Sequence, residues 1–259
     1  MFPIYVISME RSTKRREIFY ENWENNDIKN IEWIHAIDGN TADFSKWDID
    51  RKRFHRFWHN PISCCSYNTY YSNNEYGCAI SHISIYQKIV NEKIPYALIV
   101  EDDALLKSEF SNIVKNLDEI IKSKDLDLLY LYCDDRLHSF SKPEKIGVNL
   151  NNVFIKRIGV PGWDWFFNRR KIVYTTAAYV ITYEGAKKIL SKAFPIRLQA
   201  DRLLGLMAYN KLIAYKFVPN LIYISNEPTT IPLTDELIKL NKKPWYSRMA
   251  RKIKNLYHD

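Results

Sequence analysis

Glycine is scarce in this chain, with 7 residues among 259. Neither G-x-G-x-x-G nor G-x-x-x-x-G-K-[ST] occurs, which removes the usual phosphate-binding loops of dinucleotide enzymes and nucleoside triphosphatases. With so few glycines, a glycine-rich phosphate cradle is hard to build anywhere in the chain. A phosphate group bound by this protein therefore has to be held by a metal ion and by arginine.

Long apolar runs are also missing. No stretch of about 18 uncharged apolar residues occurs, so a membrane-spanning helix is not expected. The first residues lack a basic region and reach Glu10 and Arg11 too soon for a signal peptide. We expect a cytoplasmic protein.

Cysteine is sparse and forms no recognisable motif. There is no C-x-x-C pair and no histidine-spaced zinc pattern, and a cytoplasmic chain keeps its thiols reduced. We interpret the cysteines as packing residues rather than metal ligands or disulfides. They are Cys64, Cys65, Cys78 and Cys133.

The composition that remains, 46% hydrophobic and 26% charged, is typical of a soluble globular protein and excludes disorder and collagen-like repeats. The net charge of +8 favours a polyanionic partner: nucleic acid, an anionic membrane surface or a phosphorylated substrate. Outside the C-terminal tail the basic residues are scattered, and no nucleic-acid recognition motif occurs. Nucleic acid is therefore not the expected partner.

Strand and helix patterns alternate along the chain. We expect strands at 3–8, 31–37, 96–100, 126–132, 153–158 and 174–182, and helices at 11–26, 75–91, 108–123, 184–192 and 201–209. Residues 40–74 and 137–172 are irregular excursions. This alternation predicts an α/β fold with a mainly parallel sheet flanked by helices. We assign residues 1–238 to this domain and 239–259 to a separate tail.

The tail has an apolar helical face surrounded by lysine and arginine. Trp245, Met249, Ile253 and Leu256 share that face, which is the pattern of a basic helix at a membrane surface. The alternative is an ordinary packed C-terminal helix. We expect the tail to attract an anionic membrane surface.

Acidic clusters follow two of the expected strands. Glu101-Asp102-Asp103 follows the strand at 96–100, and Asp134-Asp135 follows the strand at 126–132. Ligands of open α/β sheets bind beyond the carboxyl ends of strands, and adjacent carboxylates favour Mg²⁺ or Mn²⁺. Because alternate side chains share a side, we expect Glu101 and Asp103 to face one cavity and Asp102 to point elsewhere. The alternative is a solvated acidic turn.

Cations follow the first strand at positions 11, 14, 15 and 16. If that strand neighbours the one that ends in Glu101, these cations lie where a diphosphate could use them. The alternative is a solvated basic helix face. They are Arg11, Lys14, Arg15 and Arg16.

Three further residues leave alternatives open. Ser81 and His82 are adjacent in a helix and point about 100° apart, so they form no catalytic dyad. Taken alone, His82 is a packing or hydrogen-bonding residue. Asp201 is either a helix N-cap or a carboxylate that acts as general base.

Several segments together carry a family resemblance. They are Ile4–Ser12 with Arg15-Arg16, Ala36-Ile37-Asp38-Gly39, Glu75–His82 (EYGCAISH), Ala97–Asp103 (ALIVEDD), Thr175–Ile181 with Gly185–Lys188, and Ala200-Asp201. In this order the chain resembles glycosyltransferase family 25, the bacterial lipooligosaccharide galactosyltransferases and their relatives, over residues 3–205. Ser8, Met9 and Glu10 replace the Asn, Leu and Asp usual in that family.

The resemblance implies a GT-A-like fold, a UDP-sugar donor, a Mn²⁺ or Mg²⁺ cofactor, and inverting transfer to a lipooligosaccharide or other glycan. Galactose is the family's commonest sugar, which implies a β-galactosyltransferase, with UDP-glucose or another UDP-hexose as the alternative. Such an enzyme would work on the cytoplasmic face of the bacterial inner membrane.

The resemblance also assigns roles to residues. Asp103 and Glu101 would bind the metal, Asp201 would be the base, and Asp102 would join it in catalysis, with Asp134, Asp135 and Asp164 as rival bases. The donor would be bound by Ser8, Glu10, Arg11, Arg16, Asp38, Ser81, His82 and Glu101. Trp163, Asp164 and Trp165 would bind the acceptor, unless these aromatic residues form a small hydrophobic core.

Two other functions compete with this one. A Mg²⁺-dependent phosphoesterase could use the same acidic clusters, although the sequence lacks a phosphatase signature. A non-enzymatic basic protein that binds membrane or nucleic acid would account for the charge of +8.

Overall fold

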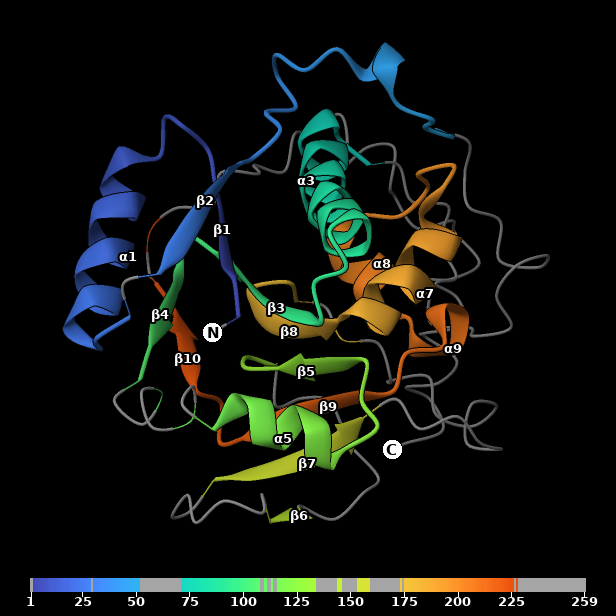
Figure 1. Ribbon diagram of the computed structural model, residues 1–259. Helices are drawn as coiled ribbons and strands as arrows, with labels where there is room; N and C mark the ends of the chain where they lie inside the picture. Colours follow the sequence, from blue (N-terminus) through green and yellow to red (C-terminus); the bar gives the residue numbers. More distant parts are fainter. Residues whose placement is uncertain are drawn as a thin grey trace, which may run out of the picture.

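The computed structural model describes most of the chain up to residue 225 (Figure 1). The described residues are 2–28, 30–51, 71–107, 110, 113, 116–133, 144–145, 153–158, 173, 175–225 and 227. Several predictions lie outside them. These concern Cys64, Cys65, Asp134, Asp135, the segment Trp163, Asp164 and Trp165, and the tail 239–259.

In the described part of the chain, eight strands form one sheet in the order β2-β1-β3-β8-β5-β9-β7-β6. Their bounds are β1 Ile4–Ser8, β2 Ile31–His35, β3 Tyr96–Glu101, β5 Leu128–Tyr130, β6 Glu144–Lys145, β7 Phe154–Ile158, β8 Ala178–Thr182 and β9 Ala214–Val218. Strands β2, β1, β3, β5, β9 and β6 run one way, and β8 and β7 run the other. The predicted α/β class with a mainly parallel sheet is confirmed.

Helices cover both faces of this sheet (Figure 1). Helices α3 (Asn73–Asn91), α7 (Tyr183–Ala193), α8 (Ala200–Gly205) and α9 (Met207–Asn210) pack on one face, and α1 (Thr13–Asn25) and α5 (Leu117–Ser123) pack on the other. A short 3-10 helix, η1 (Phe44–Lys46), follows β2. Strands β4 (Ala104–Leu106) and β10 (Ile222–Ile224) pair antiparallel beside α1.

The central strand β3 shows why the sheet has two cores. Ala97 and Ile99 contribute to the core under α3, while Leu98 and Val100 contribute to the core under α1. All four side chains are fully buried, because successive residues of a strand point to opposite faces. A strand covered on both faces reads as a continuous apolar run.

The first turn of α3 is fixed by local sequence. Ser72 and Glu75 form a reciprocal capping box, in which each side chain accepts a hydrogen bond from the other residue's backbone N–H. A Cβ at Gly77 would lie 2.4 Å from the carbonyl oxygen of Ile37, so only glycine lets α3 approach the loop after β2 this closely. This contact places the next residues of α3 beside the ends of β1 and β3.

One predicted helix, at 201–209, is two short helices, because Leu206 between α8 and α9 has non-helical backbone angles. The preceding Gly205 packs against the carbonyl oxygen of Val173, which a Cβ would meet at 1.8 Å.

Among the described residues, none of the helices has both the length and the apolar character needed to cross a bilayer.

Candidate functional site

The candidate site lies where β1 and β3 end side by side. The two strands pair in parallel with Ile7 opposite Glu101, so the residues after each strand meet at one edge of the sheet. A cavity of about 370 Å³ opens there. It is lined by Glu75, Cys78, Glu101, Asp103, Thr175, Thr176, Ala177, Gln199, Ala200, Asp201 and Ile224.

A smaller cavity of about 110 Å³ adjoins the first and shares Cys78, Glu101 and Asp103 with it. Its other lining residues come mainly from the end of β1, from the loop after β2 and from α3. They are Ile7, Ser8, Met9, Ser12, Arg15, Ala36, Ile37, Asn74, Ser81, His82 and Asp102. Glu101 and Asp103 therefore lie where the two cavities adjoin.

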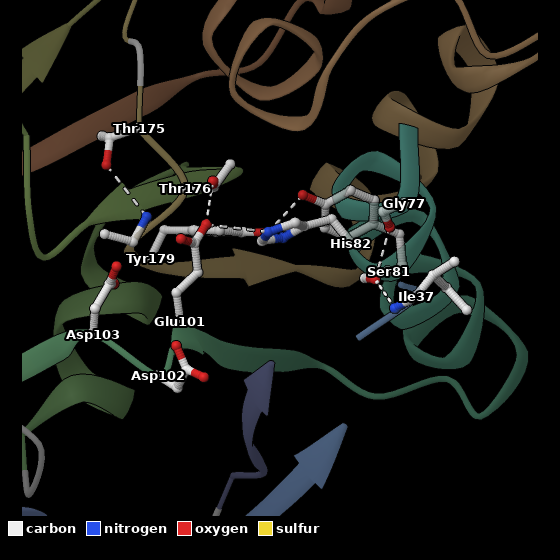
Figure 2. Close-up of polar contacts among 12 residues, drawn as sticks. Ile37, Gly77, Ser81, His82, Glu101, Asp102, Asp103, Thr175, Thr176 and Tyr179 are labelled. Carbon is white, nitrogen blue, oxygen red and sulfur yellow. Dashed lines mark hydrogen bonds and ion pairs between the residues drawn. The ribbon is translucent and has the colours of Figure 1, made fainter. Parts of the chain in front are cut away.

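The acidic triplet is split at the larger cavity, which Glu101 and Asp103 line and Asp102 does not, as predicted. All three carboxylates line the smaller cavity. Figure 2 shows the Glu101 side chain directed toward Thr176 and His82, and the Asp102 side chain directed away from them. The alternation of side chains at the strand end thus separates one carboxylate from its two neighbours.

Glu101 is held by two neighbouring side chains. The hydroxyl of Thr176 donates a hydrogen bond to Glu101 Oε1, and His82 Nε2 lies 3.5 Å from the same oxygen. Burial raises the pKa of the Glu101 carboxyl, but His82 and Thr176 outweigh burial, and the pKa lies below its usual value. Glu101 is thus kept as a carboxylate.

His82 is completely buried and belongs to a short polar chain. Its Nδ1 lies 2.7 Å from the hydroxyl of Tyr179, which lies 2.6 Å from the hydroxyl of Tyr86 (Figure 2). Burial raises the pKa of the Tyr179 hydroxyl well above its usual value, so this hydroxyl keeps its proton. The interpretation of His82 as a buried hydrogen-bonding residue is confirmed, and its donor-binding role stays a prediction.

Asp102 is held on the other side of the strand end. Ser8 Oγ donates to Asp102 Oδ2 over 2.6 Å, and Arg15 lies 2.9 Å from Asp102 Oδ1 and 2.5 Å from Asp103 Oδ2. Burial raises the pKa of Asp102, and burial together with the charge of Glu101 raises the pKa of Asp103 to about 7. These contacts describe positioning, and the catalytic role of Asp102 stays a prediction.

Of the four cations after β1, Arg15 is the one that lines the smaller cavity. Arg16 donates instead to the hydroxyl and the carbonyl oxygen of Ser8 and lies over the ring of Trp33. The remaining predicted donor residues here lie outside both cavity linings. Arg11 pairs with Asp38, Lys14 pairs with Glu227, and Glu10 is exposed.

Ser81 fastens α3 to the loop after β2. Its hydroxyl donates to the carbonyl oxygen of Gly77 and accepts from the backbone N–H of Ile37, each over 2.8 Å (Figure 2). Both partners belong to the backbone, so the hydroxyl shapes the wall of the smaller cavity. A donor contact by Ser81 stays a prediction.

Asp201 lines the larger cavity together with Glu101 and Asp103. It is the second residue of α8, and the N-cap is Gln199, so the N-cap alternative for Asp201 is wrong. Its Oδ1 is buried and has no hydrogen bond within the described residues. Burial raises the pKa of the Asp201 carboxyl. A carboxylate that faces a cavity and has a raised pKa has the properties of a general base.

Carboxylates of the kind that a hard divalent cation prefers line this cavity. Glu101, Asp103 and Asp201 line one cavity with Asp102 beside it, and Arg15 is the cation that meets them in the described structure. Asp103 Oδ1, like the free oxygen of Asp201, is buried without a hydrogen bond there. Oxygen-only donors with this excess of negative charge suit Mg²⁺ or Mn²⁺.

Sequence reasoning missed several residues of the site. Thr176 lies within the segment that carries the family resemblance, but a threonine before a strand gives no signal of a contact with Glu101. Tyr179 reads as an apolar strand residue, and Cys78 reads as a packing residue. Arg15 was one of four equivalent cations in the sequence, and only its place in α1 distinguishes it.

Comparison with known families identifies the family of this chain. Residues 1–204 match glycosyltransferase family 25 (LPS biosynthesis protein). The chain belongs to glycosyltransferase family 25. The matched residues include the acidic triplet and Asp201, and the resemblance seen in the sequence is confirmed.

Curated relatives include procollagen galactosyltransferase 2 of Mus musculus, 26% identical over 212 residues, which cover 80% of this chain and 30% of that protein. The lipooligosaccharide biosynthesis protein lex-1 of Haemophilus influenzae is 26% identical over 147 residues, covering 55% of this chain and 44% of that protein. This chain spans less than a third of the length of the procollagen galactosyltransferases it matches.

Among solved structures, a Drosophila galactosyltransferase crystallised with manganese, UDP-Gal and xylobiose aligns with a TM-score of 0.40 at 9% identity. The alignment covers 95% of this chain and 82% of that one.

Proposed function

We propose that this family 25 chain transfers a hexose, galactose first, from a UDP-sugar to a hydroxyl of a glycan acceptor with inversion at the sugar carbon. One observation carries the proposal: Asp201 of α8 and the pair Glu101 and Asp103 at the end of β3 line the same cavity. Inverting transfer needs a base for the acceptor and a charged site for the leaving diphosphate. The cavity offers both.

The leaving-group side of the proposed reaction is the acidic edge. Glu101 and Asp103 would hold Mn²⁺ or Mg²⁺, which when bound neutralises charge on the departing diphosphate. Arg15, at the mouth of the smaller cavity, would turn from the carboxylates toward a phosphate oxygen. Ser8 and Asp102 keep Arg15 and Asp103 in place for this exchange.

The acceptor side is Asp201. Its carboxylate takes the proton of the acceptor hydroxyl, whose oxygen forms a bond to the sugar carbon while the bond from that carbon to UDP breaks. The electron pair of the broken bond leaves with UDP, and attack opposite the leaving group inverts the configuration. Trp163, Asp164 and Trp165 remain the proposed acceptor contacts from the sequence.

A lipooligosaccharide or related glycan is the proposed acceptor. The relative from Haemophilus influenzae carries lipooligosaccharide biosynthesis in its name, which supports this class. We also propose work at the cytoplasmic face of an inner membrane, with the basic tail 239–259 attracted to anionic lipid. The tail's sequence supports that part of the proposal.

The test measures UDP release and product formation from UDP-galactose and from UDP-glucose, each with Mn²⁺, with Mg²⁺ and with a chelator. We expect metal-dependent UDP release that increases when a galactose- or glucose-containing oligosaccharide is added, and a β-linked product by NMR. Phosphate release without a sugar acceptor would instead support the phosphoesterase alternative. An α-linked product would contradict inversion.

A further inference from the structure

A second donor set, of different chemistry, lies where the two cavities join. Cys78 Sγ, a ring nitrogen of His82 and a carboxylate oxygen of Glu101 all lie within 4.8 Å of one another. Cys78 and His82 are four residues apart on α3, so their side chains lie on the same helix face one turn apart. Cys78 and Glu101 line both cavities, which gives solvent ions a route to the cluster.

The histidine of this cluster has a ring nitrogen without a hydrogen bond. The His82 side chain is 1% exposed, and its Nε2 makes no hydrogen bond in the described part of the chain. This nitrogen lies 3.5 Å from Glu101 Oε1, on the side toward the carboxylate (Figure 2). A buried polar atom left without a hydrogen bond costs free energy, and a bound cation would remove that cost.

The other ring nitrogen is held in the manner usual for a metal-binding histidine. When Nδ1 carries the ring proton, it donates to the hydroxyl of Tyr179 at 2.7 Å, and Tyr179 can donate onward to Tyr86. Nε2 then faces Glu101 Oε1, and a cation between the two atoms would bind both. Histidines that bind metals commonly donate their second N–H to such a partner, which fixes the ring and its tautomer.

We infer that Cys78, His82 and Glu101 form a binding site for a borderline-soft divalent cation, zinc above all. Sulfur and imidazole donors favour zinc over the Mn²⁺ or Mg²⁺ that the oxygen donors of Glu101 and Asp103 suit. The ligand atoms of a tetrahedral zinc ion lie about 3.3 to 3.7 Å apart. Side-chain rotations that move the ligand atoms on the order of 1 Å would bring the three atoms from within 4.8 Å to these distances. A water from the cavity completes the coordination.

Binding at this site is balanced without a redox step. The Cys78 thiol loses its proton to solvent as the sulfur–metal bond forms, and the metal stays divalent. Because Glu101 belongs to both donor sets, a zinc ion here draws that carboxylate away from the oxygen-only site. Zinc would therefore compete for Glu101 with the Mn²⁺ or Mg²⁺ proposed to bind the UDP-sugar donor.

The test uses the metal-free full-length protein under reducing conditions, with CoCl₂ as a spectroscopic stand-in for zinc. We expect a near-ultraviolet thiolate-to-cobalt band and the intense visible bands of tetrahedral cobalt, both removed by ZnCl₂. MnCl₂ at the same concentration should leave them, since manganese binds such donors more weakly. This readout needs no transferase activity, so it fails or succeeds independently of the proposed function.

Variants assign the signal to the site. Cys78→Ser should abolish the thiolate band, and Tyr179→Phe should raise the zinc Kd about 10- to 100-fold by releasing the ring. Cys133→Ser and the double variant Cys64→Ser with Cys65→Ser are matched controls that should keep the band. The triple variant lacking Cys64, Cys65 and Cys133 should keep the band too. Cys78 is its one remaining cysteine, so this variant tests the assignment even if Cys78→Ser fails to fold.

Two outcomes would overturn the inference. One is the absence of a thiolate band in the unaltered protein with excess cobalt. The other is a band that survives in folded Cys78→Ser or disappears in the triple variant, since the sulfur would then come from elsewhere.

Discussion

The hydroxyl of Ser8 at the end of β1 donates to the carboxylate of Asp102 after β3, over 2.6 Å and across 94 residues of sequence. The same hydroxyl accepts a hydrogen bond from Arg16 Nε over 2.8 Å. One small side chain therefore joins two strand ends and the first helix. The Ser8 hydroxyl fixes the position of the Asp102 carboxylate. Arg15 pairs with both Asp102 and Asp103, so it links the positions of these two carboxylates.

Replacing Ser8 with alanine should destabilise the fold. Asp102 and Arg16 would each lose a partner in a buried place, which costs about 1–3 kcal/mol. For a chain of this size that lowers Tm by roughly 2–4 °C per kcal/mol, measurable by circular dichroism. Ser191→Ala is the control, because the exposed Ser191 hydroxyl donates to the carbonyl oxygen of Lys188 on its own helix. Equal shifts in the two variants would refute the role of Ser8.

Replacing Asp201 with asparagine should remove the proposed base. We expect kcat for sugar transfer to fall about 10²- to 10⁴-fold, because the acceptor hydroxyl would have to lose its proton to water. The Kd for UDP in the presence of Mn²⁺ should change little, since Asp201 belongs to α8 and is not one of the proposed metal ligands. Transfer within a few-fold of the unaltered protein would remove Asp201 from the mechanism.

Asp201 should also leave a signature in stability as a function of pH. Burial raises its pKa in the folded state above that of the unfolded chain, so its contribution to stability is present at low pH. That contribution is lost as pH rises through the folded-state pKa. Asp201→Asn cannot lose it, so the Tm of the variant minus that of the unaltered protein should grow with pH from about 4 upward and then level off.

Asp43→Asn provides a control of opposite sign. The hydrogen bonds from Ser45 lower the pKa of the exposed Asp43, so its contribution is present at higher pH and is lost as pH falls through the lowered pKa. The Asp43→Asn variant should therefore lose Tm relative to the unaltered protein as pH rises. Parallel trends in the two variants would contradict both assignments.

Asp103→Asn tests the metal ligand. UDP with Mn²⁺, at about 100 times Kd, should stabilise the unaltered protein by roughly 2.7 kcal/mol, read as a Tm shift. The variant should lose that shift, because the nucleotide then meets an acidic edge without its cation. Glu92→Gln, at the exposed end of α3, should keep it. A full shift with Asp103→Asn would assign the cation to other ligands.

The basic tail predicts a separable membrane affinity. Deleting residues 240–259 should weaken binding to vesicles rich in anionic phospholipid, since each lysine or arginine near such a surface contributes about 1 kcal/mol. Transfer to a water-soluble acceptor should be unaffected, and neutral vesicles should show no difference. Unchanged binding to anionic vesicles after the deletion would remove the tail from the proposed localisation.

The elements that the sequence predicts well are long or strongly patterned. Strands β1 and β3 and helices α1, α3 and α7 fall within a few residues of their expected bounds. Strands β4, β6, β9 and β10 were missed. Three of them, β4, β6 and β10, have only two or three residues, which carry little periodicity. The direction of β8 was also missed, since an apolar run reports burial on both faces but not the way the strand points.

The site was predictable to the extent that side-chain alternation fixes it. The different directions of the Glu101 and Asp102 side chains follow from alternation at the end of β3. The choice of Arg15 over Arg16 depends on how α1 packs against the sheet, which no local pattern contains. The contact between Cys78 and His82 of α3 and Glu101 of β3 depends on the close approach at Gly77.

Strand β8 runs against both of its neighbours, so the chain enters it at the edge where β3 leaves. The pairing of β8 with β3 determines two contacts. Thr176, just before β8, contacts Glu101, and Tyr179, within β8, contacts His82. A slip of one residue would turn Tyr179 to the opposite face of the sheet. The register of the backbone hydrogen bonds between β8 and β3 thus positions the Glu101, His82, Thr176 and Tyr179 side chains. The chemistry of the cavity therefore depends on sheet hydrogen bonds that lie outside it.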